Sequence, residues 1–232
     1  MNRLPIETRV KILEMLCDGI SMRSVSCLVG VSINTVTKLL LDTGTACAKY
    51  HEKHVCNVQV RRVQSDVIWS FGRRKKNALS DVKLEGNEDV WTWIGMDADS
   101  QLMISYLVEN RSAESAIKFI KDLRSRLSTH IQLTMNNHRL CFEAAQSTSH
   151  QDVDYAQIVE IYGSLPEEHE GCGLTKYVGK KFDTHFGMLA IYFMFHNFVR
   201  LHKVQKMSPA MIAGIEDQLW EMKDLAQLVE GK

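Results

Sequence analysis

The sequence predicts an α/β protein with an amino-terminal helix-turn-helix, a mixed sheet with helices, and further helices at the carboxyl end. Three observations lead to this prediction. Apolar residues recur at helical spacing over residues 5–40, strand-like apolar runs fill residues 64–108, and a capped amphipathic helix follows at residues 112–127. With 232 residues, 45% of them hydrophobic, the chain can bury a substantial core.

The first forty residues follow the pattern of a helix-turn-helix. Apolar spacing predicts one helix over residues 5–17, a second that Ser21 caps, and a third that Ser32 caps after a turn at Gly30. In such a module the third helix presents side chains to base edges and phosphates. The residues predicted to contact DNA on this helix are Ser32, Asn34, Thr35, Thr37 and Lys38. The alternative is a trio of helices that binds no DNA.

A further helical stretch is predicted over residues 43–57, after the third helix. Cys47 and His51 are four residues apart and could share a helix face, so a zinc site is one interpretation, although no paired cysteine motif accompanies them. The alternative is an ordinary helical linker. Arg61 and Arg62 follow it and are predicted to contact DNA phosphates.

Charge is distributed unevenly along a chain whose formal net charge is zero. Residues 1–76 carry 13 Lys and Arg against 6 Asp and Glu, so the first third has a net charge of +7. A basic segment of this kind favours a polyanion partner, although solvated surfaces can show the same bias. No run of 18 apolar residues exists, and the amino terminus lacks the apolar region of a signal peptide. We therefore expect no membrane partner and a cytoplasmic, DNA-associated protein.

Asp66 interrupts the strand predicted at residues 64–71, where Val67, Trp69 and Phe71 share one face at period two. A carboxylate in an apolar strand is disfavoured unless a cation or hydrogen bonds compensate it. A metal site is one explanation, and a hydrogen-bonded Asp near the start of the strand is the other.

The elements after this strand continue the α/β pattern. Strands at residues 90–96 and 102–108 form a predicted hairpin with Asp97 in its turn, and Ser112 caps the next helix. Two more strands are expected, at residues 130–134 and 155–162. An apolar helix over residues 182–202 is predicted to pack on the sheet, and an amphipathic helix is predicted at residues 215–228.

A strand with a central Asp, a hairpin, a helix and a strand that ends in a polar residue is the order of a ribonuclease H-like core. Several phrases together resemble the transposases of insertion-sequence-one type, which are DDE recombinases. The matching phrases are GVSINTVTKLL at 30–40, DVIWSF at 66–71, DVWTW at 89–93, VDYAQ at 153–157, YF at 192–193, NFVRLHK at 197–203 and MSPA at 207–210.

The resemblance implies a domain order and an ancestral chemistry. It implies a helix-turn-helix domain at residues 1–45, a helical linker at 46–62, a ribonuclease H-like domain at 63–205 and a C-terminal helical segment at 206–232. The activity implied is Mg²⁺-dependent cleavage and transfer of double-stranded DNA at the terminal inverted repeats of an element, with a homo-oligomer left open. Two metal ions about 3.5–4 Å apart, held by three carboxylates, perform that chemistry.

The departures from the family pattern concern these carboxylates. Asp66 corresponds to the first catalytic, metal-binding Asp, whereas Asn136 stands at the position of the second acid. The phrase that carries the third acid is missing, as though a stretch near residues 171–174 had been deleted. Glu143, Glu167, Glu168 and Glu170 are more simply read as solvated charges than as substitutes. The sequence therefore predicts a degenerate or internally deleted copy that binds DNA with impaired catalysis.

Two alternatives remain open at this point. One is a non-enzymatic DNA-binding repressor or a domesticated transposase remnant. The other is an active nuclease with a rearranged site.

Overall fold

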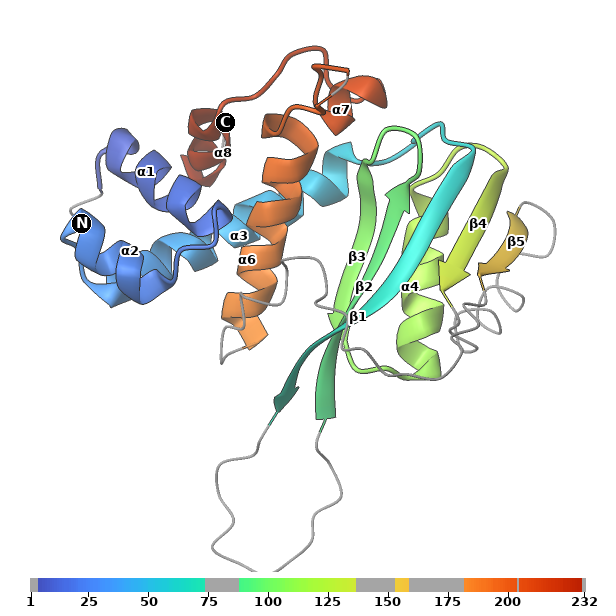
Figure 1. The fold of residues 1–232 in the computed structure, drawn as a ribbon, viewed down its shortest axis with the longest axis horizontal. Coiled ribbons are helices and arrows are strands. Elements are labelled where there is room, and N and C mark those ends of the chain that lie inside the picture. Colours follow the sequence, from blue (N-terminus) through green and yellow to red (C-terminus); the bar gives the residue numbers. More distant parts are fainter. Residues whose placement is uncertain (1–3, 74–87, 137–152, 159–181, 204, 231–232) are drawn as a thin grey trace, which may run out of the picture. The chain divides into compact units, whose positions relative to one another are not determined.

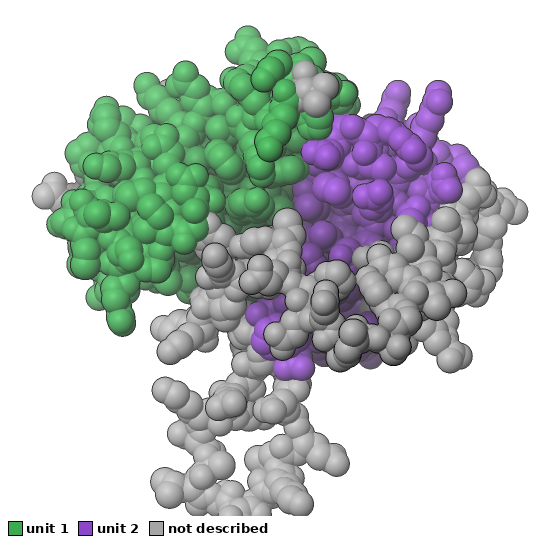
Figure 2. All heavy atoms as spheres, viewed as in Figure 1, with its two compact units in different colours: residues 1–56, 170–232 green, residues 57–169 purple. Residues whose placement is uncertain are grey.

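The computed structural model describes residues 4–73, 88–136, 153–158, 182–203 and 205–230 (Figure 1). The chain forms two compact units, one made of residues 57–169 and the other of residues 1–56 together with 170–232 (Figure 2). The second of these, here called the helical unit, contains helices from both ends of the chain. The first, the sheet unit, is mixed α/β, so the predicted fold class is confirmed at this level.

Helices α1 (Ile6–Cys17), α2 (Met22–Val29) and α3 (Ile33–His54) open the helical unit. The predicted caps are present: Ser21 Oγ accepts a hydrogen bond from the Ser24 amide, and Ser32 Oγ accepts one from the Thr35 amide, each at 3.1 Å. Gly30 ends α2 at a φ of 71°, a left-handed conformation that glycine adopts at little cost.

Helix α3 corrects one sequence prediction, because it is a single helix of 22 residues instead of a short helix followed by a separate helical stretch. It therefore continues through residue 45, where we expected a domain to end. The physical reason lies in its neighbour, α6 (Phe182–Met194). A Cβ at Gly44 would lie 2.5 Å from the Cα of Gly187 in α6, so the two helices cross where neither has a side chain. That packing stabilises α3 around Gly44, a residue of low helix propensity.

Helix α6 packs on α3 within the helical unit, at the crossing of Gly44 and Gly187. The helix continues into a π-helical turn, Phe195–Val199, and α7 (Pro209–Ile212) follows.

The last helix is shorter than the sequence predicts. Helix α8 (Met222–Gln227) and the 3₁₀ turn Leu228–Glu230 replace the helix expected from residue 215. Glu221 and Asp224 form a capping box, which starts α8 at Met222. Arg9 of α1 is buried and holds this end of the chain, because it donates to the Ala226 carbonyl at 3.2 Å and pairs with Glu230 at 2.6 Å.

The sheet unit is built on five strands in the order β3-β2-β1-β4-β5. The strands are β1 (Arg62–Arg73), β2 (Glu88–Asp97), β3 (Met103–Glu109), β4 (Ile131–Asn136) and β5 (Val153–Ile158). Strands β1 to β3 are antiparallel neighbours, whereas β4 is parallel to β1 and β5 to β4. The predicted hairpin is present, and Asp97 accepts a hydrogen bond from the Ser100 amide in its turn.

Helix α4 (Ala113–Ser125) covers one face of the sheet (Figure 1). Trp93 contacts Phe119 of this helix, with ring centroids 6.0 Å apart, and a Cβ at Gly95 would lie 2.9 Å from Leu123. Because Val67 pairs with Trp93 and Ser65 with Gly95, these residues of β1 share the face that α4 covers. Asp66 lies between them and therefore belongs to the opposite face.

Within the described ranges no single helix is both long and apolar enough to cross a membrane. Helices α2 and α3, bent by 116° at their junction, qualify only jointly and only by length and composition.

Candidate metal position and nucleic-acid interface

Asp66 lies in the middle of β1, flanked by β2 and β4. Its backbone pairs with Ile94 of β2, and its side chain is half-buried on the face away from α4. The carboxylate accepts a hydrogen bond from the Val67 amide at 2.8 Å, through Oδ1. The hydrogen-bonded interpretation of this Asp therefore has a partner in the structure, and the second oxygen is left for another ligand.

Asn136 is the last residue of β4, the strand next to β1. In the parallel register Met135 pairs with Ser65, so the backbone positions of Asn136 and Asp66 come next on these neighbouring strands. Two residues that are 70 positions apart in the sequence are thus adjacent in the sheet, as the resemblance implies for the first two acids.

The donors at this position do not fit a two-metal centre. Asp66 supplies one carboxylate, and Asn136 is an amide, which binds a hard divalent cation less strongly than a carboxylate. The third-acid candidates Glu143, Glu167, Glu168 and Glu170 lie outside the described residues, as does the apparent deletion near residues 171–174. Among the residues that the structure does describe, no group of three His, Cys, Asp or Glu could hold a metal ion.

The zinc interpretation of Cys47 and His51 gains no support. Both side chains are buried in the core of the helical unit. Burial raises the pKa of the Cys47 thiol far above its ordinary value, and it raises the pKa of Cys17 to about 12. In the part of the chain that the structure describes, neither residue belongs to a group of three His, Cys, Asp or Glu that could hold a metal ion.

The five predicted DNA-contacting residues of α3 fall into two groups. Asn34 and Lys38 are exposed at the amino-terminal end of the helix. Ser32 caps the helix, its hydroxyl lies 2.9 Å from that of Thr35, and Thr37 donates to the Ile33 carbonyl at 2.9 Å. Three of the five therefore have local structural bonds, and Asn34 and Lys38 are the strongest candidates for direct contact.

Arg61 and Arg62 are both exposed at the start of β1, in the sheet unit. The Arg62 guanidinium forms an ion pair with Asp99, in the turn between β2 and β3. This hydrogen bond lowers the pKa of the Asp99 carboxyl below its usual range and raises the pKa of Arg62. A DNA phosphate would therefore have to displace Asp99 before it could bind Arg62. Arg61 is not part of this ion pair.

One cluster was missed by the sequence analysis, which placed Trp69 on an apolar face of β1 with Val67 and Phe71. The side chain of Phe71 lies outside the described residues, and the register shifts between Trp69 and Phe71. Trp69 is 49% exposed. Its partner across the sheet is Trp91, and the Arg111 guanidinium stacks on the Trp91 ring. The apolar residues around Trp91 and Trp93 indicated a strand, but the sequence did not indicate that Trp69, the cross-strand partner of Trp91, would be exposed.

No family model matches this chain, and no curated protein does. Solved structures with some similarity include a simian T-cell lymphotropic virus intasome in complex with the PP2A regulatory subunit B56 gamma. That match has 12% identity and a TM-score of 0.41, and covers 66% of this chain and 55% of that one. The Mos1 strand transfer complex matches at 11% identity and a TM-score of 0.27, over 67% of this chain and 59% of that one.

A Mos1 transposase paired-end complex with the left transposon end matches at 12% identity and a TM-score of 0.28, over 67% of this chain and 60% of that one. The chain thus spans less than two thirds of each of these proteins. Likenesses this weak carry no conclusion about function, which has to come from the chain's own residues.

Proposed function

We propose that this protein binds double-stranded DNA, descends from a transposase of insertion-sequence-one type, and has lost or nearly lost strand cleavage. In this proposal the sheet unit is a ribonuclease H-like domain and the amino-terminal helices are a helix-turn-helix. The DNA partner is the terminal inverted repeat of the related element.

The observation that carries the proposal is the arrangement around Asp66. The order of a strand with a central Asp, a hairpin, a helix and a strand that ends in a polar residue recurs as β1, β2–β3, α4 and β4. The parallel register then makes the backbone positions of Asp66 and Asn136 neighbours. This agrees with two positions of a metal site in which one acid has been replaced.

DNA binding is supported by the amino-terminal helices. A turn of three residues, 30–32, with left-handed Gly30 joins α2 to α3, and the first turns of α3 carry the exposed Asn34 and Lys38. An amide and an ammonium group at the start of a recognition helix suit base edges and phosphates, respectively. The net charge of +7 over residues 1–76 favours the same polyanion.

Loss of cleavage follows from the donors. Phosphoryl transfer by two metal ions needs charge at both positions, to activate the attacking oxygen and stabilise the leaving one. With Asn136 in place of an acid, Asp66 would hold a Mg²⁺ ion only weakly. The same substitution favours the second candidate, a non-enzymatic repressor or domesticated remnant that occupies element ends. Intact inverted repeats around the gene would instead indicate a recent element copy.

A combined gel-shift and cleavage assay on terminal-repeat DNA tests both parts of the proposal. We expect a shifted complex in moderate salt and no strand cleavage with Mg²⁺ or Mn²⁺. Lys38→Ala should weaken the complex, whereas Lys11→Ala, at an exposed position of α1, should not. Cleavage that Asp66→Ala abolishes would overturn the loss of catalysis, and the absence of any complex would overturn the DNA-binding assignment.

A further inference from the structure

Two tryptophans and an arginine form a cluster on the sheet unit, here called the Trp-Arg platform (Trp69, Trp91, Arg111), in which Trp69 and Arg111 are exposed and Trp91 is half-buried. Trp69 lies directly opposite Trp91 in the antiparallel pairing of β1 and β2, so both indoles project from the same face. The guanidinium carbon of Arg111 lies 4.7 Å from the Trp91 ring centroid. Trp69 is 49% exposed, although burial of a side chain this large is strongly favourable.

Within the sheet unit, Trp69 lies one cross-strand row beyond the residues on which Phe119 of α4 packs. Helix α4 covers the cross-strand row of Val67, Trp93 and Leu107, because Phe119 packs on Trp93. The next row along the strands contains Trp69, Trp91 and Glu109, and there Trp69 is left half exposed.

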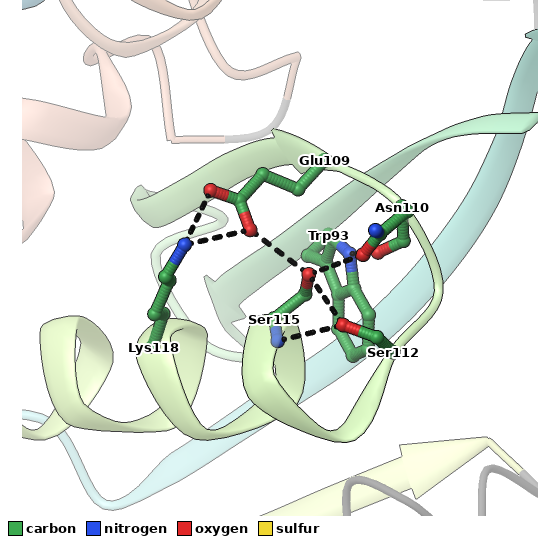
Figure 3. Close-up of polar contacts among 6 residues, drawn as sticks. All are labelled: Trp93, Glu109, Asn110, Ser112, Ser115 and Lys118. Carbon is green, nitrogen blue, oxygen red and sulfur yellow. Dashed lines mark hydrogen bonds and ion pairs between the residues drawn. The ribbon is translucent and has the colours of Figure 1, made fainter. Parts of the chain in front are cut away.

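The charges at this row favour an anionic occupant. Glu109 is the carboxylate of the row, and Lys118 of α4 contacts both of its oxygens, at 2.9 and 3.2 Å (Figure 3). Ser115 also donates to Glu109, at 2.9 Å. The negative charge of Glu109 is therefore balanced within the protein, while Arg111 adds a positive charge on the ring itself. Asp89, exposed two residues before Trp91, is the carboxylate that opposes this bias.

An occupant with flat aromatic faces and negative charge fits a pair of indoles beside a guanidinium. Unpaired nucleotides have both features, since their bases expose faces that stack on aromatic side chains and their phosphates attract arginine. A duplex offers base edges in its grooves, while neighbouring bases hide those faces. The platform therefore suits a single strand better than a duplex.

We propose that the Trp-Arg platform binds unpaired nucleotides of a DNA strand by stacking of a base on Trp69, with Arg111, which lies over the Trp91 ring, beside the strand's phosphates. The proposal rests on the proposed function, since it gives this DNA-binding protein a second, single-strand surface. Trp69 lies three residues after Asp66 on β1, about 10 Å away at the usual rise of a strand, and on the other face. The platform is thus separate from the former metal position.

Titration of the full chain with three short fluorescent probes of equal length tests the platform. The probes are oligothymidylate, the same sugar-phosphate strand without bases, and a terminal-repeat duplex. We expect Trp69→Ala to weaken oligothymidylate binding about 5- to 150-fold, the range for loss of one stacked base. Trp69→Phe should retain most of the affinity, and binding of the strand without bases should be unchanged. Leu219→Ala, which removes a 42% exposed apolar side chain from the helical unit, is the matched control and should bind like the wild type.

The outcomes separate this proposal from the proposed function. If Trp69→Ala binds oligothymidylate as tightly as the wild type, the platform assignment is wrong, whether or not the duplex is bound. If oligothymidylate binding depends on Trp69 but no duplex is bound, the platform stands and the helix-turn-helix assignment fails. Quenching of indole emission by oligothymidylate, reduced in Trp69→Phe, gives an independent readout of stacking.

Discussion

Helix α3 and strand β1 each run through the middle of a unit, and they respond differently to changes of side chain. Helix α3 crosses α6 at Gly44 and Gly187, where not even a methyl group fits. Strand β1 is held to β2 and β4 by backbone hydrogen bonds, which do not depend on whether residue 136 is an acid or an amide. A sheet can therefore keep its backbone geometry whether a side chain on it is an acid or an amide, whereas the helix crossing has no such freedom.

The largest loss of stability should come from Gly44→Ala, which adds a methyl group at the crossing of α3 and α6. A Cβ 2.5 Å from a backbone atom forces the helices apart, and such overpacking costs on the order of 3 kcal/mol. Hydrogen exchange should quicken in α3 and α6 while β1 and β2 keep their protection. Gly30→Ala is the matched control: a Cβ there meets nothing within 4 Å, so only the strain of its positive φ, about 1–2 kcal/mol, remains. Equal losses for the two variants would contradict the role given to the crossing.

Lys38→Ala tests the exposed start of the same helix without touching its packing. We expect terminal-repeat duplex to bind several-fold more weakly and the salt dependence of binding to decrease by about one unit of slope, since one phosphate contact is lost. Thermal stability should be nearly unchanged because the side chain is exposed. Lys49→Ala, at an exposed position later on α3, is the control. An unchanged salt slope for Lys38→Ala would place the DNA on another surface.

Asn136→Asp places an acid beside Asp66 and tests whether this position of the sheet can bind a metal ion. Without metal, two carboxylates on adjacent strands repel, so the variant should unfold at a slightly lower temperature than the wild type. Mn²⁺ should then stabilise the variant more than the wild type, by on the order of 1 kcal/mol, through binding to the folded state. Gln132→Glu, the same change of charge earlier on β4, should show no Mn²⁺ response. Raised strand cleavage in Asn136→Asp would support the rearranged-nuclease alternative, and no change would count against it.

The smallest effect should come from removing the exposed ion pair between Arg62, the first residue of β1, and Asp99. The pKa of Asp99 is lower in the folded state than in the unfolded state. The ion pair therefore stabilises the fold at pH values above the ordinary pKa of an Asp carboxyl, and this contribution is lost as the pH falls through the lowered pKa. The difference in Tm between wild type and Asp99→Asn should thus be small at about pH 7, smaller still at about pH 3, and reduced by salt. A difference that grew on acidification would show that the pair does not act in this way.

The helix caps and the turn between β2 and β3 could be predicted from the sequence. Ser21, Ser32 and Ser112 cap the helices expected of them, and Asp97 bonds within its turn. Each of these hydrogen bonds joins residues three positions apart, so residue type and spacing are sufficient to identify it. The candidate site was predictable only as a resemblance, because Asp66 and Asn136 belong to different strands.

What the sequence by itself determined was therefore the class of the fold, its caps and turns, and the presence of an amide at position 136. Tertiary structure alone decided that α3 is one continuous helix, that α6 packs on it, and that Asp66 and Asn136 are neighbours in register. It also decided that Trp69 is exposed. The physical reason is that these features depend on which distant segment packs on which surface. Hydrophobic packing is non-directional, so the local sequence does not indicate the segment on which a given surface will pack.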